Sequence, residues 1–387
     1  MDAGRIASIA KKERGNEASL SYKDNFIMNH GRKETEMKRR MFLVLLVFAI
    51  ALPAGLEAAG KNELVVASWG GIFQKAQREA YFAPFEKATG IKVIDVSPPR
   101  AAKIKAMVES KNMEWDIVYA AAGIYGTCLR QGLVEKVDYK YFDKKTLDEL
   151  YPECKKEYAV GNFYFSVSMA YNTNVYSKAN HPKNWAEFWD VKKFPGPRSL
   201  MDGSVAGSGQ WEFALLADGV PADQIYSNPD LERAFRKLKE LKPNVSKWWK
   251  EGQEGAQLLV DKEAVLGGPY DGRISKLRQD GAPVDVEFNQ GLLQLEYMFI
   301  PKGAPNYENA LKFLAFSSTA EPQVHFGKIY PNGPANKRVF EIIPAEQGRL
   351  MCSHPDNKKR MLLYGEDWMA QNMEKVIERW NKWILEK

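Results

Sequence analysis

The stretch LVVASWGGIFQKAQREAYFAPFEKATGIKVIDV, residues 64–96, decides the fold that the sequence predicts. It opens with a short apolar run typical of a buried strand, and this run ends abruptly at the WGG of residues 69–71. Apolar residues then recur at helical spacing over residues 73–85, and a second apolar run follows at residues 91–96. The segment therefore predicts a strand, a helix and a second strand in succession.

The same alternation continues beyond this segment. A helix is expected over residues 103–111 and a third strand over residues 116–119. Strands that alternate with helices form a mostly parallel sheet whose two faces are both covered. The sequence thus predicts an α/β fold.

A second α/β block begins after residues 164–171, where apolar and small polar residues alternate as in a strand. A helix is expected over residues 229–241, with Asn228 as its cap and Pro229 at its first position. The other expected elements are a strand and glycine turn at 200–209, a helix at 210–217, strands at 264–268 and 297–300, and helices at 307–316 and 368–383. Because no repeat or long linker separates the two blocks, we expect two lobes joined by crossing strands.

The N-terminal part resembles a secretion signal. Three basic residues, 38–40, precede about 12 nearly unbroken apolar residues at 41–52, and small residues follow. A membrane-spanning helix needs roughly 20 apolar residues, whereas a signal peptide needs fewer and carries this basic flank. We predict a signal peptide at residues 37–59, an upstream extension without a fold at residues 1–36, and export to the periplasm.

Composition excludes some classes of function. The 387 residues are 45% hydrophobic and 27% charged, which is enough to build a large core. The formal net charge of +6 is spread along the chain, whereas a nucleic-acid surface needs clustered charge. The three cysteines allow one disulfide or three unpaired thiols, and their spacing does not decide between these.

Several segments together resemble a known family. In chain order they are LVVASWGG (64–71), PFEKATGIKV (84–93), WDIVYAAAG (115–123), GGPYDGRISKLRQDGAPV (267–284) and IPKGAPNYENALKFLAF (300–316). They resemble the periplasmic solute-binding proteins of ABC importers, and most of all the spermidine and putrescine branch. The resemblance covers residues 62 to about 345.

The resemblance implies the type II binding-protein fold, with two α/β lobes that close on a ligand about two hinge strands. Lobe 1 would hold residues 62–165 and 298–345, lobe 2 residues 166–297, and residues 346–387 would form a C-terminal helical segment packed on the lobes. A small-molecule ligand and an inner-membrane ABC permease would be its partners, with no nucleic acid and no cofactor. We expect a monomer.

Ligands of such sheets bind beyond the carboxyl ends of the strands, where the loops converge. Four segments supply suitable residues there, including backbone amides at the helix start after Gly209 and aromatic rings that could stack on a ligand. The expected ligand-binding residues are Ser68, Trp69, Gly70, Gly71, Ala121, Ala122, Asp202, Ser204, Ser208, Gly209, Trp211, Trp248, Tyr270, Asp271, Arg273 and Glu296.

Two of these residues indicate the kind of ligand. Glu296 resembles an ammonium-binding carboxylate of the polyamine branch, whereas Arg273 stands where that branch carries an acid. Ala121 and Ala122 also stand where polyamine binders tend to carry hydroxyl groups. An arginine fork suits carboxylate or phosphonate, so the pair favours a zwitterion such as an ω-amino acid or an aminophosphonate. Two alternatives remain: a true polyamine ligand, and a surface ion pair of Arg273 with Asp271 or Glu287.

The sequence does not favour an enzyme. It contains no glycine-x-serine-x-glycine motif and no P-loop, and its four histidines are far apart with no metal-ligand spacing. A sensor that docks on a membrane receptor would need the same fold as an importer component, so the sequence leaves that alternative open.

Overall fold

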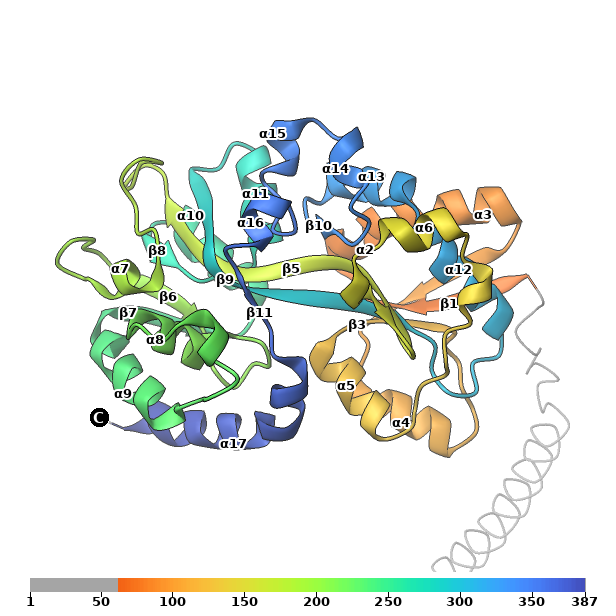
Figure 1. The fold of residues 1–387 in the computed structure, drawn as a ribbon, viewed down its shortest axis with the longest axis horizontal. Coiled ribbons are helices and arrows are strands. Elements are labelled where there is room, and N and C mark those ends of the chain that lie inside the picture. Colours follow the sequence, from red (N-terminus) through yellow and green to blue (C-terminus); the bar gives the residue numbers. More distant parts are fainter. Residues whose placement is uncertain (1–61, 387) are drawn as a thin grey trace, which may run out of the picture. The chain divides into compact units, whose positions relative to one another are not determined.

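The computed structural model describes residues 62–386, drawn in colour in Figure 1. The expected extension at residues 1–36 and the expected signal peptide at residues 37–59 lie outside the described residues. Among residues 62–386, no helix combines the length and the apolar character that crossing a bilayer requires.

One mixed sheet runs through the described part of the chain. Its main path has the order β2-β1-β3-β9-β5-β8-β6-β7. The strands are β1 (Glu63–Ala67), β2 (Lys92–Val96), β3 (Ile117–Ala121), β4 (Lys155–Lys156), β5 (Ala159–Asn172), β6 (Arg198–Met201), β7 (Val245–Trp249), β8 (Leu266–Gly267), β9 (Val284–Phe299), β10 (Gly333–Pro334) and β11 (Leu362–Leu363). Strands β1, β2 and β3 pair in parallel at one end, and β6, β7 and β8 do so at the other. This arrangement confirms the expected α/β fold class.

Helices connect and cover these strands. They are α2 (Gly71–Gln77), α3 (Ala83–Thr89), α4 (Ala101–Glu109), α5 (Ala122–Arg130), α6 (Lys144–Glu149), α7 (Trp185–Trp189), α8 (Gln210–Ala217), α9 (Leu231–Leu241), α10 (Gly252–Val260), α11 (Asp271–Gln279), α12 (Tyr307–Ser317), α13 (Ala320–Ile329), α14 (Val339–Ile342), α15 (Ala345–Gly348), α16 (Pro355–Lys358) and α17 (Glu366–Leu385). A π-helical turn at Arg78–Phe82 joins α2 to α3, so the single helix expected at 73–85 is present with a local widening.

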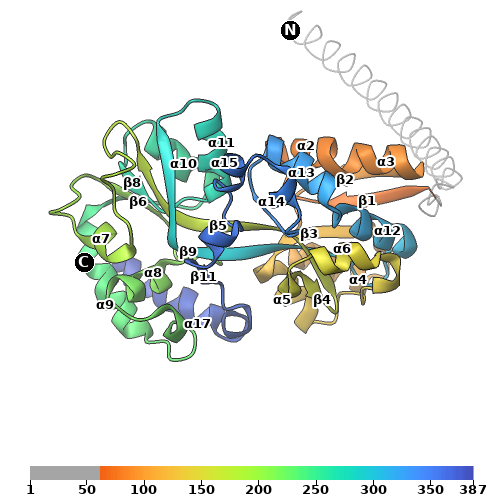
Figure 2. The same ribbon diagram turned by 45° about the horizontal axis from the view of Figure 1, so that its top comes forward.

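Two long strands join the halves of the molecule. Strands β5 and β9 pair antiparallel along most of their lengths, β9 then pairs with β3, and β5 pairs with β8. In Figures 1 and 2 both strands run from one half to the other. Helices α2, α10, α11 and α13 lie on one side of them, and α5 and α17 lie on the other.

Buried side chains form two large hydrophobic clusters. One gathers around β1–β3, α2–α5, α12 and α13, and we call this half lobe 1. The other gathers around β6–β8, α7–α11 and α17, and we call this half lobe 2. Because each half buries its own apolar core, each can keep its internal packing while β5 and β9 bend between them.

The sequence pattern predicted the buried face of helix α9 but not the residue that caps it. Ala234, Phe235, Leu238 and Leu241 are buried, as their helical spacing predicts. The expected cap was wrong: the helix begins at Leu231, and the side chain of Asp230 accepts a hydrogen bond from the Arg233 N–H at 2.9 Å. A carboxylate satisfies the free amides of the first turn well, so Asp230 takes the cap position instead of Asn228.

The C-terminal helix α17 is fastened to lobe 2. Its Trp380 and Trp383 are buried against Trp248 and Phe235. The ammonium group of Lys242 donates hydrogen bonds to the carbonyls of Trp383 and Ile384 at 3.2 and 2.9 Å, which satisfies acceptors at the helix end. The three cysteines are all buried and unpaired within the described residues.

Candidate functional site

Glu296 is a buried carboxylate on the strand that joins the lobes. It lies on β9 opposite Ala121 of β3 and Phe163 of β5, and its exposed fraction is 3%. Its Oε1 accepts a hydrogen bond from the indole N–H of Trp69 at 2.5 Å, and no lysine or arginine of residues 62–386 pairs with it. Burial raises the pKa of Glu296 to about 8, although the indole N–H acts in the opposite direction.

Trp69, which binds this carboxylate, lies just beyond the end of β1. Gly70 and Gly71 have φ of 78° and 60°, so the chain can turn sharply from β1 into α2. Ser68 is fully buried, and its hydroxyl donates to Gln77 Oε1 at 2.6 Å. This hydrogen bond ties the end of β1 to α2. Trp69 itself is 43% exposed, so its ring remains available to a ligand.

Arg273 is a half-buried cation on α11. Its Nη1 donates to Gln253 Oε1 at 2.8 Å, and the ion pairs found among residues 62–386 do not include it. Asp271 Oδ1 instead accepts from the backbone N–H of Ser166 at 2.6 Å, and Glu287 pairs with His181 and Arg360 at 3.4 Å each. The alternative of an ion pair with Asp271 or Glu287 is therefore wrong.

Tyr270 is an aromatic residue packed close to Arg273. Its ring lies edge-on to Phe165 at 5.9 Å and to Trp249 at 6.1 Å between ring centroids. Burial raises its pKa to about 12, while Arg273 lowers and Glu296 raises it. A Cβ on Gly252 would lie 2.9 Å from both the Tyr270 ring and Arg273 Nε, so this ring lies close to the guanidinium.

The loop after β6 reaches toward lobe 1. Gln294 of β9 donates from Nε2 to the carbonyl of Gly207 at 2.9 Å. A Cβ on Gly123, in the first turn of α5, would lie 3.5 Å from the Cβ of Ala206, so this loop touches the helix that follows Ala121 and Ala122. The loop therefore contacts both lobe 1 and a joining strand.

Polar groups within this loop mostly bind one another. Asp202 Oδ1 accepts from the backbone N–H of Ser204 at 2.8 Å and from its hydroxyl at 2.5 Å. Ser208 is buried, and Gly209, with φ of 79°, precedes α8. A Cβ on Gly209 would collide with the ring of Phe213, so glycine is required for close packing at this turn.

Three expected site residues lie elsewhere in the structure. Trp211 is 3% exposed and packs against Tyr226 and Trp368 in the core of lobe 2. Trp248 packs against Trp380 and Trp383, and Asp271 is fully buried beside β5. We leave these three out of the site that we propose.

Sequence reasoning missed Trp249, Phe165 and Gln253. Trp248 and Trp249 lie in strand β7, where successive side chains point to opposite faces. Trp248 therefore faces α17, and Trp249 contacts Tyr270. The run VSKWW of residues 245–249 does not alternate cleanly between apolar and polar residues, so the local pattern gave no clear signal for this strand.

A separate cavity of about 390 Å³ lies between α5 and the start of α17. Ala122 is the expected site residue that lines it, and neither Glu296 nor Arg273 does. Side chains alternate along a strand, so Glu296 and Tyr297 face opposite sides of β9. The Tyr297 hydroxyl donates to Glu366 Oε1 at 2.6 Å near this cavity, which therefore belongs to the other side of the joining strands.

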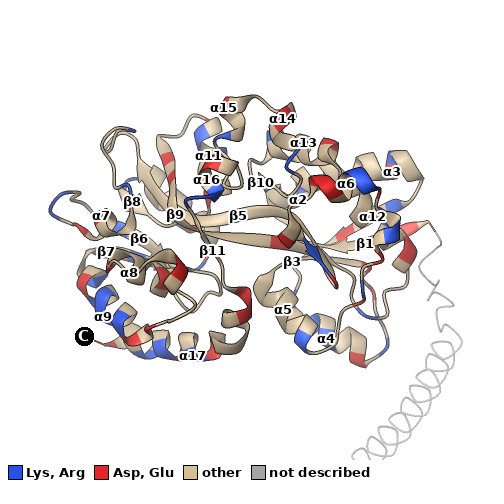
Figure 3. Cartoon of the chain, in the orientation of Figure 1, with Lys and Arg blue, Asp and Glu red and all other residues tan. Residues whose placement is uncertain are grey.

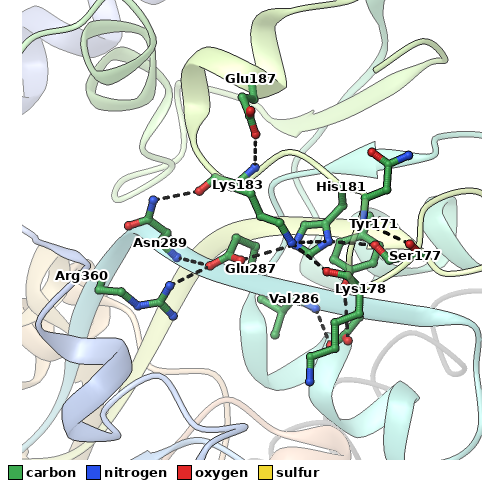
Figure 4. Close-up of polar contacts among 12 residues, drawn as sticks. Tyr171, Ser177, Lys178, His181, Lys183, Glu187, Val286, Glu287, Asn289 and Arg360 are labelled. Atoms are coloured by element: carbon green, nitrogen blue, oxygen red, sulfur yellow. Dashed lines mark hydrogen bonds and ion pairs between the residues drawn. The ribbon is translucent and has the colours of Figure 1, made fainter. Parts of the chain in front are cut away.

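Figure 4 shows a second polar cluster, in lobe 2, that holds the loop around His181 to β9. The His181 ring stacks on Tyr171 at 4.1 Å, and its Nε2 lies 3.4 Å from Glu287 Oε2. Glu287 also accepts from the backbone N–H of Asn289 at 2.8 Å and pairs with Arg360. Each polar group has a partner inside the cluster, so we interpret it as structural.

Glu287→Ala is expected to lower the free energy of unfolding by about 1–3 kcal/mol, because it leaves the buried His181 ring and the half-buried N–H of Asn289 without this partner. Chemical denaturation measures the change, with the exposed Glu374→Ala on α17 as the control. Ligand affinity should not change. A variant that folds with wild-type stability but no longer binds ligand would contradict the structural interpretation.

In the view of Figure 3, Lys and Arg lie over both lobes with Asp and Glu among them. Within residues 62–386, no group of three or more His, Cys, Asp or Glu is placed to hold a metal ion.

Two sheet-built lobes joined by crossing strands, with a carboxylate and a guanidinium that have no charged partner among residues 62–386, define a class of protein that holds a small charged solute. Comparison with protein families agrees. Residues 80–348 match the family model described as bacterial extracellular solute-binding protein, and the chain belongs to this family.

Individual relatives match over nearly their whole lengths. The γ-aminobutyric acid-binding protein of Pseudomonas aeruginosa is 32% identical over 91% of this chain and 99% of its own. A solved structure described as a GABA receptor is 33% identical with a TM-score of 0.75, and it covers 84% of this chain and 98% of its own. An ABC transporter substrate-binding protein from Bradyrhizobium japonicum is 35% identical with a TM-score of 0.76, over 83% of this chain and 99% of its own.

These comparisons confirm the resemblance and the type II fold that it implied. The chain is a solute-binding protein of the ABC-importer type, and its family binds solutes and is not a family of enzymes.

Proposed function

We propose that this protein captures a small ω-amino acid, with γ-aminobutyrate as the first candidate. The ligand ammonium would lie at Glu296 and Trp69, and the ligand carboxylate at Arg273. The observation that carries the proposal is a buried acid, Glu296, and a guanidinium, Arg273, neither of which forms an ion pair among residues 62–386. Two relatives named for γ-aminobutyrate support it.

The ammonium end has a physical reason to bind at Glu296. A carboxylate that is 3% exposed has lost most of its hydration, and one indole N–H compensates only part of this cost. An arriving ammonium would restore the missing charge partner, and the half-exposed ring of Trp69 could add a cation–π contact.

The carboxylate end has a matching reason to bind at Arg273. A guanidinium offers two parallel N–H donors to a carboxylate, and its single contact with Gln253 leaves donors free. A diamine of similar length would instead bring a second ammonium to this cation, and like charges in a partly dry cleft repel. The polyamine alternative is therefore disfavoured. An aminophosphonate remains compatible, because a phosphonate also suits the arginine fork.

The wider role follows from the family. We infer that the mature protein is exported by the signal peptide at residues 37–59, acts as a monomer in the periplasm, closes on its ligand and delivers it to an ABC permease. In the sensor alternative the closed form docks on a membrane receptor instead. Loss of labelled γ-aminobutyrate uptake on deletion of the gene supports import, whereas unchanged uptake with loss of a ligand-dependent response supports the sensor.

A thermal-shift panel on ligand-stripped protein tests the proposed ligand class. At a hundred times its dissociation constant a ligand stabilises by about 2.7 kcal/mol, which raises the melting temperature by several degrees. We expect this shift with γ-aminobutyrate, a comparable or smaller one with aminoethylphosphonate, and none with putrescine or spermidine at the same concentration. A larger shift with spermidine would favour the polyamine alternative, and native mass spectrometry of the untreated protein would identify a co-purified ligand.

A further inference from the structure

The first residues of α10 form the immediate surroundings of Arg273. Gln253 Oε1 accepts a hydrogen bond from Arg273 Nη1 at 2.8 Å. A Cβ on Gly252 would lie 2.9 Å from Arg273 Nε and 2.9 Å from Tyr270 Cδ2, which is closer than real Cβ contacts come. The start of α10 thus touches both the guanidinium and the aromatic ring beside it.

The hydrogen-bond partner of Arg273 is the neutral amide of Gln253, so the guanidinium keeps its full positive charge. An amide oxygen fixes one N–H of a guanidinium but leaves its positive charge in place, whereas a carboxylate would also cancel that charge. The acids nearby are engaged elsewhere or do not pair with it. Glu254 pairs with Lys247 at 3.0 Å, Asp271 binds the Ser166 N–H, and Glu251 forms no ion pair with Arg273 among the described residues.

Gly252 supplies the space in which this arrangement fits. Its φ is not in the left-handed region, so the requirement for glycine is steric rather than conformational. The ring of Tyr270 is held by Trp249 and Phe165 and has little room to move. A methyl group at residue 252 would therefore press on the ring of Tyr270 and displace the side chain of Arg273, which is the more flexible of the two neighbours.

We propose that Gln253 and Gly252 are positioning residues that set the preference of the site for a ligand with an anionic end. Gln253 holds the guanidinium without neutralising it, and Gly252 lets it lie against Tyr270. This inference rests on the proposed function, in which Arg273 binds the ligand carboxylate.

Gln253→Glu tests the neutral-partner role. The variant places a carboxylate of almost the same shape beside Arg273, where it competes with the ligand carboxylate. We expect the affinity for γ-aminobutyrate to fall at least tenfold, and the affinity for n-butylamine, which has the same carbon chain without the carboxylate, to stay the same or rise. Isothermal titration calorimetry with both compounds measures the ratio. Gln253 is exposed, so the variant should fold normally.

Gln257→Glu is the matched control. It adds the same charge to the exposed face of the same helix, one turn further on, where Gln257 contacts Asp261 and not Arg273. Its γ-aminobutyrate affinity should stay within twofold of wild type. An equal loss in both variants would show a general charge effect and would overturn the assignment to Gln253.

Gly252→Ala tests the steric role through a different change. We expect at least a tenfold loss of γ-aminobutyrate affinity and an unchanged n-butylamine affinity, with a melting temperature a few degrees lower because the methyl group also meets the packed ring of Tyr270. If both variants bind γ-aminobutyrate like wild type while Arg273→Ala does not, this inference is wrong and the proposed function stands. If Arg273→Ala also binds normally, the proposed function itself fails.

Discussion

Replacing Arg273 with alanine is expected to weaken γ-aminobutyrate binding at least a hundredfold, roughly 2.7 kcal/mol. The loss arises because the ligand carboxylate would enter the cleft without a cation to replace its water, and truncating one partner of such a pair costs about 2–5 kcal/mol. Isothermal titration calorimetry on the ligand-free protein measures the effect. Arg273→Lys keeps the charge but not the planar fork, so its affinity for γ-aminobutyrate should lie between those of wild type and Arg273→Ala.

The control for this experiment is Arg236→Ala, which removes an exposed arginine from the surface of α9. Both variants should fold, since Arg273 makes no ion pair within the described residues that folding would lose. Arg273→Glu is expected to shift the preference toward putrescine, because it restores an acid where the polyamine branch carries one. Wild-type affinity in Arg273→Ala would remove this residue from the site.

The affinity for γ-aminobutyrate is expected to fall roughly tenfold for each pH unit below about 8. The pKa of Glu296 in the ligand-free protein is raised to about 8 by burial, and the ligand ammonium binds only the ionised carboxylate. At pH 7 binding must therefore release close to one proton. Calorimetry in buffers of different ionisation enthalpy counts this proton, and titrations from pH 6 to 9 trace the affinity.

Glu296→Gln separates binding from stability. An acid whose pKa is higher in the folded than in the unfolded protein lowers the stability of the fold as the pH rises. For Glu296 this loss of stability occurs between pH 4.5, which is its ordinary pKa, and about pH 8. The amide of the variant cannot ionise and still accepts the Trp69 N–H. Its ligand-free form should melt at a higher temperature than wild type at pH 8, and its binding of γ-aminobutyrate should be lost.

Glu374→Gln, at an exposed position of α17, controls for the change in net charge and should alter neither property. An affinity that is constant from pH 6 to 9, or binding without proton release, would show that Glu296 does not carry the ligand ammonium.

The sequence predicted the strands and helices whose patterns are set by local burial. The run at residues 64–96 needs only apolar spacing and glycines to define β1, α2, α3 and β2, and the same holds for α8. Strand β9 shows the limit, because only residues 297–300 were expected while it spans Val284–Phe299. Its polar residues Asp285 and Glu287 are bound by Arg278 and His181, and such tertiary partners leave no trace in a local pattern.

Some residues of the candidate site could likewise be predicted from the sequence, and others could not. Arg273 and Glu296 could be proposed because of the resemblance to the polyamine branch: Glu296 stands where that branch carries an ammonium-binding acid, and Arg273 replaces a second acid. Trp211 and Trp248 were expected to contact the ligand because aromatic rings can stack on it, but both pack against the hydrophobic core of lobe 2. Gln253 could not be found from sequence, since a glutamine becomes informative only when the structure shows that its partner is Arg273.

The most direct test of the whole account is a crystal structure of the protein with γ-aminobutyrate bound. We predict one ligand between the lobes, with its carboxylate on the Arg273 guanidinium and its ammonium within hydrogen-bond distance of Glu296. A ligand bound in the reverse orientation, or at a place where it touches neither side chain, would contradict the account.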